Sequence, residues 1–142
     1  MKKILLIEDD TVLRETTAEL LELSDFEVRT AADGKNGIQM AKEYMPDVIV
    51  CDIMMPEIDG YGVLSTLSQD KHTKSIPFIF LSAKTERKDV RKGMELGADD
   101  YLTKPFKETE LIGAIESRLA RMAILNDTEA NAKNIKKRSG IK

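Results

Sequence analysis

The sequence has few of the residues that build covalent cross-links and zinc sites. It contains one cysteine, one histidine and no tryptophan in 142 residues. A single cysteine excludes an internal disulfide, and one histidine with one cysteine cannot supply the ligands of a zinc site. Any metal that the chain binds must therefore be held by oxygen atoms.

Long hydrophobic runs are also missing. No apolar stretch approaches the roughly 18 residues that a membrane-crossing helix needs, and the opening run reaches Glu8 too soon for a signal peptide. With 42% hydrophobic and 33% charged residues, the composition is that of an ordinary globular chain. We therefore expect a cytoplasmic protein that does not contact membranes.

The charge balance gives no general reason to expect nucleic-acid binding. The net charge is −3, although residues 127–142 carry five basic and two acidic side chains and are therefore at +3. Most basic tails of this kind are simply solvated. We expect no direct nucleic-acid binding by this chain alone.

Short apolar runs alternate with segments of helical periodicity along the chain. The run Ile4-Leu5-Leu6-Ile7 is typical of a strand covered on both faces, as in a parallel sheet. The spacing predicts strands over residues 4–7, 28–31, 48–51, 78–81 and 101–102, and helices over residues 11–23, 35–44, 61–67, 85–96 and 107–125. This alternation predicts an α/β fold with helices on both faces of a five-stranded parallel sheet. Right-handed crossovers favour the flavodoxin-like, doubly wound strand order 2-1-3-4-5.

A chain of this length has room for one domain. We assign residues 1–125 to that domain and residues 126–142 to a basic C-terminal tail or the start of a linker. The last helix runs on to Leu125, further than packing on one sheet requires. It either covers the tail or contacts another chain or domain, and a further helix is expected over residues 128–137.

Polar side chains gather where the predicted strands end. Because the carboxyl ends of parallel strands open onto one edge of a sheet, we expect these side chains to converge. Glu8, Asp9 and Asp10 follow the first predicted strand, and Asp52 follows the third. Ser82 follows the fourth strand and Lys104 the fifth. Crowded carboxylates repel by roughly 1 kcal/mol per pair at 4 Å in water, which a cation relieves. The pattern predicts a pocket for a phosphoryl group and Mg²⁺, because Mg²⁺ prefers oxygen ligands and shares its shell with phosphate.

Three of these residues are candidates for phosphoryl transfer itself. Asp52 would act as the nucleophile and become an acyl phosphate. Lys104 would place a positive charge on one phosphoryl oxygen, and the hydroxyl of Ser82 would donate a hydrogen bond to another. Positioning and charge neutralisation of this kind supply most of the catalysis in phosphoryl transfer.

The candidate metal ligands are carboxylates and one carbonyl. Asp9 would bind Mg²⁺ directly and Glu8 directly or through water, with Asp52 and the backbone carbonyl of Met54 completing the set. Asp10 is better suited to cap the helix that begins after it.

These segments resemble the receiver domains of bacterial two-component response regulators. The resemblance covers about residues 2–122, and its matching stretches occur in the family's order and spacing: residues 4–10, 48–60, 80–83 and 97–106. Glu8 replaces a commoner aspartate and Ser82 a commoner threonine. Both replacements keep the chemistry of the side chain.

The resemblance implies that a histidine kinase or phosphotransfer protein phosphorylates Asp52 and that Mg²⁺ is required. It also implies that the chain is not an enzyme in the usual sense, since it catalyses only its own phosphorylation and dephosphorylation. Ser82 is expected to move toward the phosphoryl group, Tyr101 to turn inward, and the bond between Lys104 and Pro105 to be cis. The surface of the fourth helix, fifth strand and fifth helix would then signal to a downstream protein or output domain, or pair with a second copy.

Other interpretations use the same fold. A phosphohydrolase of the haloacid-dehalogenase type would need an aspartate where Met54 stands. A flavodoxin-like FMN carrier would need a phosphate cradle where the chain has Glu8-Asp9-Asp10. A receiver-shaped interaction module without phosphorylation would not need a complete pocket.

Within the favoured interpretation, we expect a receiver that acts alone, and the alternative is the receiver fragment of a longer DNA-binding transcriptional regulator. The sequence leaves open the cognate kinase, the output, the oligomeric state and the lifetime of the phosphoryl group.

Overall fold

Strands and helices alternate along the chain as predicted. The computed structural model describes residues 1–138, with side chains described for residues 1–128. The described elements are β1 (Lys3–Ile7), α1 (Thr11–Leu23), β2 (Glu27–Ala31), α2 (Gly34–Tyr44), β3 (Val48–Asp52), α3 (Gly60–Ser68), β4 (Phe78–Ser82), α4 (Arg87–Glu95), β5 (Asp100–Thr103) and α5 (Glu108–Arg138). The strands pair in parallel in the order β2-β1-β3-β4-β5, which confirms the predicted topology.

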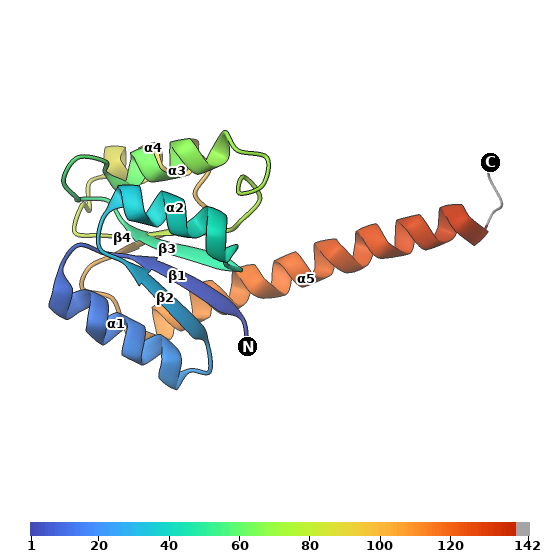
Figure 1. Cartoon of the computed structure of the whole chain (residues 1–142), viewed down its shortest axis with the longest axis horizontal. Helices are drawn as coiled ribbons and strands as arrows, with labels where there is room; N and C mark the ends of the chain where they lie inside the picture. Colours follow the sequence, from blue (N-terminus) through green and yellow to red (C-terminus); the bar gives the residue numbers. More distant parts are fainter. Residues whose placement is uncertain (139–142) are drawn as a thin grey trace.

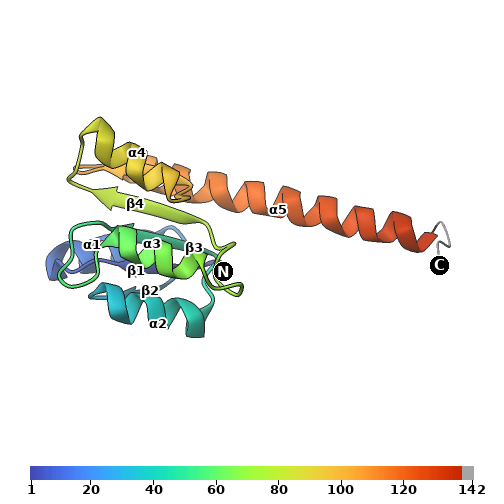
Figure 2. The same cartoon turned by 90° about the horizontal axis from the view of Figure 1, so that it is seen from above.

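The helices cover both faces of the sheet. Figures 1 and 2 show α2 and α3 on one face, and α1 with the first part of α5 on the other. Alternate residues of β1 enter the two cores that result: Leu5 and Ile7 pack in one cluster, and Ile4 and Leu6 pack in the other. Full burial of such an aliphatic side chain stabilises the fold by roughly 1.5–3 kcal/mol. The sheet is therefore held rigidly from both sides.

Helix α5 is much longer than predicted. The expected end at Leu125 is wrong, since the helix continues to Arg138, and the separate helix expected over residues 128–137 is part of it. Residues 114–138 contain no glycine or proline that would stop a helix. The second half of α5 projects away from the sheet (Figures 1 and 2). The predicted domain boundary after residue 125 lies inside this continuous helix and stays a prediction.

Helix α4 is shorter than predicted and loosely attached. It was expected over residues 85–96, but the backbone is still extended at Glu86, with ψ at 145°, and the Glu86 side chain makes no capping hydrogen bond. The buried residue of α4 is Gly93. In contrast, the first three helices each begin after an aspartate whose carboxylate accepts a hydrogen bond from a backbone N–H three residues further on. The expected cap at Asp10 is confirmed.

None of the described helices, including the long α5, combines the length and apolar character needed to cross a membrane.

Helix α3 begins directly against the end of β3. The N–H of Gly60 donates to the carbonyl oxygen of Ile53 at 2.9 Å. A Cβ at position 60 would overlap the carbonyl oxygen of Asp52 and would lie 2.8 Å from the Cα of Ile53. Because these neighbours are backbone atoms, they cannot move aside easily. The close approach of α3 to the end of β3 therefore needs a glycine.

This contact leads to a first prediction, which compares two glycines. Gly60→Ala should lower the free energy of unfolding by about 1–3 kcal/mol, because the added methyl group forces the backbone apart. Gly113→Ala is the matched control: its Cβ would meet nothing within 4 Å, so alanine should stabilise α5 by up to about 1 kcal/mol. Urea unfolding followed by circular dichroism measures both changes. Equal effects of the two substitutions would contradict the packing argument.

Candidate functional site

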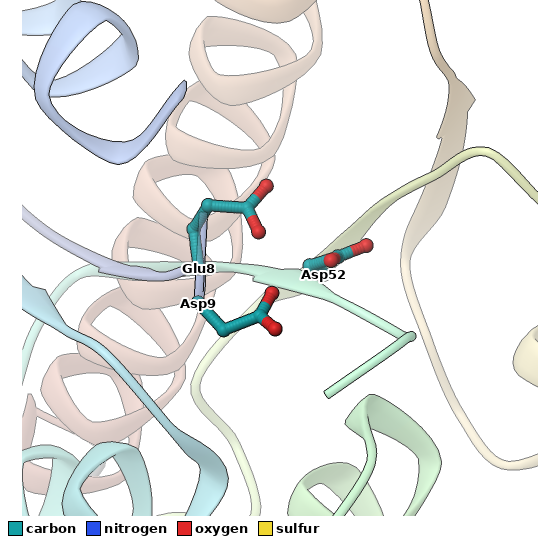
Figure 3. A group of neighbouring side chains, drawn as sticks. All are labelled: Glu8, Asp9 and Asp52. Carbon is teal, nitrogen blue, oxygen red and sulfur yellow. The ribbon is translucent and has the colours of Figure 1, made fainter. Parts of the chain in front are cut away.

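Three carboxylates meet at the carboxyl edge of the sheet. Strand pairing places Ile7 opposite Cys51, so the residues that follow, Glu8 and Asp52, emerge side by side. The side chains of Glu8 and Asp9 extend toward Asp52 (Figure 3), and one oxygen of each of the three residues lies within 4.8 Å of the others. Glu8 and Asp52 are buried, with 3% and 6% of their surface exposed, whereas Asp9 is exposed. The convergence predicted from the strand ends is present.

Lys104 bridges the two buried carboxylates. Its Nζ lies 2.7 Å from Oε1 of Glu8 and 3.4 Å from Oδ1 of Asp52. The lysine follows β5, and the peptide bond to Pro105 is cis, as predicted. The backbone N–H of Lys104 donates to the carbonyl oxygen of Ser82 at 2.8 Å, which ties the residue to the end of β4. Lys104 is therefore fixed at both its backbone and its ammonium group.

One oxygen of Asp52 is already held in place. Oδ1 accepts a hydrogen bond from the N–H of Ile53 at 2.8 Å and also faces Lys104. Oδ2 accepts no hydrogen bond from the part of the chain whose side chains are described. The carboxylate is thus oriented through one oxygen, and the other remains available for chemistry.

The electrostatics follow from an excess of negative charge. Burial, a hydrogen bond with Glu8 and the charge of Glu8 raise the pKa of Asp9, and Lys104 offsets only part of this rise. Burial alone would lower the pKa of Lys104, but the hydrogen bond to Glu8 and the charges of Asp52 and Glu8 outweigh it and raise that pKa. Lys104 therefore stays protonated at neutral pH. One ammonium group faces three carboxylates, and the pocket can still accept a cation.

The donor set fits a hard divalent cation. Carboxylate oxygens from Glu8, Asp9 and Asp52 lie close enough to share one ion, and the described residues form no second group of three such side chains. Oxygen donors of this kind suit Mg²⁺ or Ca²⁺ far better than a soft metal. Met54, whose carbonyl was predicted to join them, lies two residues after Asp52 with an exposed side chain.

Ser82 and Tyr101 lie on β4 and β5 beside the acidic cluster. Ser82 is fully buried at the end of β4, and its Oγ accepts a hydrogen bond from the N–H of Lys84 at 3.1 Å. The hydroxyl of Tyr101 donates to the carbonyl oxygen of Lys84 at 2.7 Å, and its ring centroid lies 5.9 Å from that of Phe80. Burial raises the pKa of Tyr101, so the hydroxyl keeps its proton. Both side chains thus contact the segment that leads into α4.

Cys51 is a core residue. Its side chain is fully buried in the cluster beneath α2 and α3. Burial and the charge of Asp52 raise the pKa of the thiol well above its ordinary value. The thiol is therefore protonated and unreactive.

Sequence reasoning missed Arg14. Its Nη1 lies 2.9 Å from the carbonyl oxygen of Glu8 and 3.4 Å from that of Asp9, so it contacts the loop that carries both acids. A basic residue four positions after the capping Asp10 is a signal that could have been noticed. Its partners could not, because a lysine or arginine in the first turns of a helix is usually solvated.

A cavity of about 500 Å³ lies at the opposite edge of the sheet, away from these residues. It is lined by apolar side chains of α5, among them Leu119 and Met122, together with Ile76 and Pro77 before β4. No metal-binding group of described residues lies there. A cavity of nearly the same size, about 490 Å³, lies beside Lys104 and Pro105, so size does not identify the site. The convergent charged groups place it at the carboxyl edge.

Comparison with known proteins agrees with this geometry. The model of the response regulator receiver domain family matches residues 4–116. RpaA of Synechocystis, a DNA-binding dual master transcriptional regulator, is 37% identical over 85% of this chain, which spans only 50% of RpaA. PilG of Pseudomonas aeruginosa is 38% identical over 82% of this chain and 87% of PilG. The chain thus spans about half of some relatives and most of others.

Solved structures give the same result. A response regulator receiver domain protein from Clostridium thermocellum superimposes with a TM-score of 0.82 and 28% identity, over 88% of this chain and 99% of that one. The receiver domain of a Francisella response regulator gives a TM-score of 0.81 and 33% identity, over 86% and 99%. The chain therefore belongs to the response regulator receiver domain family, the phosphoacceptor proteins of two-component signalling.

Proposed function

We propose that Asp52 is the phosphoacceptor and that it takes its phosphoryl group from the phosphohistidine of a kinase or phosphotransfer protein. The observation that carries this proposal is that Asp52 lies 3.4 Å from the Lys104 ammonium group and has one oxygen within 4.8 Å of carboxylate oxygens of Glu8 and Asp9. An oxygen of Asp52 attacks phosphorus, the phosphorus–nitrogen bond breaks, and the imidazole nitrogen keeps the electron pair. The product is an aspartyl phosphate.

Asp52 fits this role better than its neighbours. Glu8 already makes the shortest contact with Lys104, at 2.7 Å, and so acts as the partner of the cation. Asp9 is exposed, and its carboxylate forms no ion pair among the residues whose side chains are described. In Asp52, Oδ1 is fixed by the Ile53 N–H, while Oδ2 accepts no hydrogen bond from the residues whose side chains the structure describes. A nucleophile held in one orientation loses little freedom on reaching the transition state.

Mg²⁺ is the cofactor that best matches the acidic cluster. Glu8, Asp9, Asp52 and the backbone carbonyl of Met54 would hold it, and when bound it neutralises negative charge on the phosphoryl oxygens. Lys104 adds a fixed positive charge 3.4 Å from Oδ1 of Asp52. The hydroxyl of Ser82 supplies a hydrogen-bond donor to a remaining phosphoryl oxygen.

The response would spread from the end of β4 to the neighbouring surface. Ser82 moves toward the phosphoryl group, and Tyr101 follows because both contact the backbone of Lys84. The surface formed by α4, β5 and α5 then changes and contacts a downstream protein, an output domain or a second copy. The chain acts as a signalling protein whose only catalysis is its own phosphorylation and dephosphorylation.

The phosphoacceptor assignment predicts the outcome of labelling with acetyl phosphate and Mg²⁺. The wild-type chain should gain one phosphoryl group, measured by intact-mass spectrometry, and Asp52→Asn should gain none because the amide is not a nucleophile. Asp33→Asn is the matched control: this residue caps α2, asparagine caps equally well, and labelling should persist. Equal labelling of wild type and Asp52→Asn would refute the assignment.

The charge excess predicts a second effect, on stability. Because the pKa of Asp9 is raised above its ordinary 3.8, the ionised form destabilises the folded state. Asp9→Asn should therefore raise the free energy of unfolding at pH 7 without metal, by at most about 1 kcal/mol since water screens this exposed group. The gain should shrink as the pH falls toward 3.8 and disappear about one unit below that value, where the aspartate is protonated in both states.

Added Mg²⁺ should reverse this order. Millimolar Mg²⁺ should stabilise the wild-type chain against urea and have little effect on Asp9→Asn, because the variant lacks one metal ligand. Asp33→Asn should respond to Mg²⁺ as the wild type does. A chain whose stability ignores Mg²⁺ would contradict the metal site.

A further inference from the structure

Arg14 makes an unusual contact with the loop between β1 and α1. Its guanidinium points back from the first turns of α1, and Nη1 donates to the carbonyl oxygen of Glu8 at 2.9 Å and, more weakly, to that of Asp9 at 3.4 Å. The side chain is half-buried. It therefore holds the two peptide groups whose residues carry the proposed metal ligands.

The other bonds in this loop leave these carbonyl groups to Arg14. The N–H of Glu8 donates to the carbonyl oxygen of Ala31 at 3.0 Å, which fixes the loop on the side of β2. The carboxylate of Asp10 accepts from Leu13 and caps the helix. Arg14 adds hydrogen bonds to the carbonyl oxygens of Glu8 and Asp9. The loop is therefore fixed by bonds to β2, to the start of α1 and to the side chain of Arg14.

Charge alone does not explain this position. A cation near the N-terminus of a helix is opposed by the helix macrodipole. A positive charge beside a Mg²⁺ site also repels the ion. For Mg²⁺ binding, the charge of Arg14 is therefore unfavourable, whereas its hydrogen bonds to two carbonyl oxygens favour an ordered ligand loop. The geometric and the electrostatic roles therefore have opposite signs, and an experiment can separate them.

We propose that Arg14 is a positioning residue for the Mg²⁺ ligands. By fixing the peptide groups of Glu8 and Asp9, it keeps both carboxylates directed toward Asp52. The proposal rests on the proposed function, because it concerns the same acidic cluster. Arg14 itself touches neither the phosphoryl group nor the ion.

The test measures Mg²⁺ affinity by isothermal titration calorimetry, with no phosphoryl donor present. Arg14→Ala should bind Mg²⁺ about three- to tenfold more weakly than the wild type, because the loop loses its charge-assisted hydrogen bonds. Arg14→Lys, which keeps the charge and one donor group, should fall between the two. Arg121→Ala removes the same charge from an exposed position on α5 and should leave the affinity unchanged.

Wild-type or tighter affinity in Arg14→Ala would overturn the proposal, because this is the outcome that loss of charge alone produces. Circular dichroism checks the fold of each variant. If the alanine variant does not fold, Arg14→Gln takes its place: glutamine is neutral and too short to reach both carbonyls, so it must also bind Mg²⁺ more weakly. A wild-type chain that binds no Mg²⁺ would instead refute the proposed function, and with it this inference.

Discussion

One half-buried lysine holds together the ends of three strands. Lys104, after β5, contacts Glu8 after β1 and Asp52 at the end of β3. Burying charges is unfavourable unless they are paired, and a pair seldom recovers the whole cost of desolvation. Here one cation must serve two buried carboxylates, with a third beside them. The arrangement does little to stabilise the fold, but it suits a site that binds a further cation from solution.

The rest of the fold tolerates this edge because the sheet is packed on both faces. Leu5 and Ile7 fill one core and Ile4 and Leu6 the other, so β1 is immobilised up to the residue before Glu8. The aspartate caps of the first three helices satisfy backbone groups at the same edge. Gly60 lets α3 approach the end of β3 closely. Unfavourable charge is thus concentrated where neighbouring backbone cannot shift to relieve it.

Much of the fold could be predicted because each level of the sequence pattern agrees. Buried strands appear as continuous apolar runs, turns carry glycine or proline, and strict alternation leaves few parallel topologies. The convergence of Glu8, Asp52 and Lys104 followed from strand order alone, because parallel strands end at one edge. The length of α5 was predicted less accurately. Its apolar stripe fades after Leu125, but the helix continues because no glycine or proline occurs in residues 114–138.

The contacts made by individual side chains could not be predicted from the sequence, for a different reason. Lys104 was expected beside Asp52, yet its shortest contact is with Glu8, which lies 96 residues away in the chain. The choice depends on the extra methylene of glutamate, which carries the carboxylate further across the pocket than aspartate would. Arg14 is similar: its position in α1 is visible in the sequence, but its carbonyl partners depend on how the loop turns. Distances of an ångström decide such contacts, and residue patterns do not encode them.

Helix α4 is weakly attached because few contacts hold it at this edge of the sheet. Two tyrosine hydroxyls tie this part of the chain to the sheet and to α3: Tyr101 donates to the carbonyl of Lys84, just before α4, and Tyr61 donates to that of Asp89 within α4. The helix has no side-chain cap, and its buried residue is a glycine that packs against Phe80 and the Tyr101 ring. A segment with so few buried side chains opens or shifts at low free energy. Because Ser82 accepts its hydrogen bond from the N–H of Lys84, whose carbonyl binds Tyr101, a displacement at the end of β4 reaches α4 through one residue.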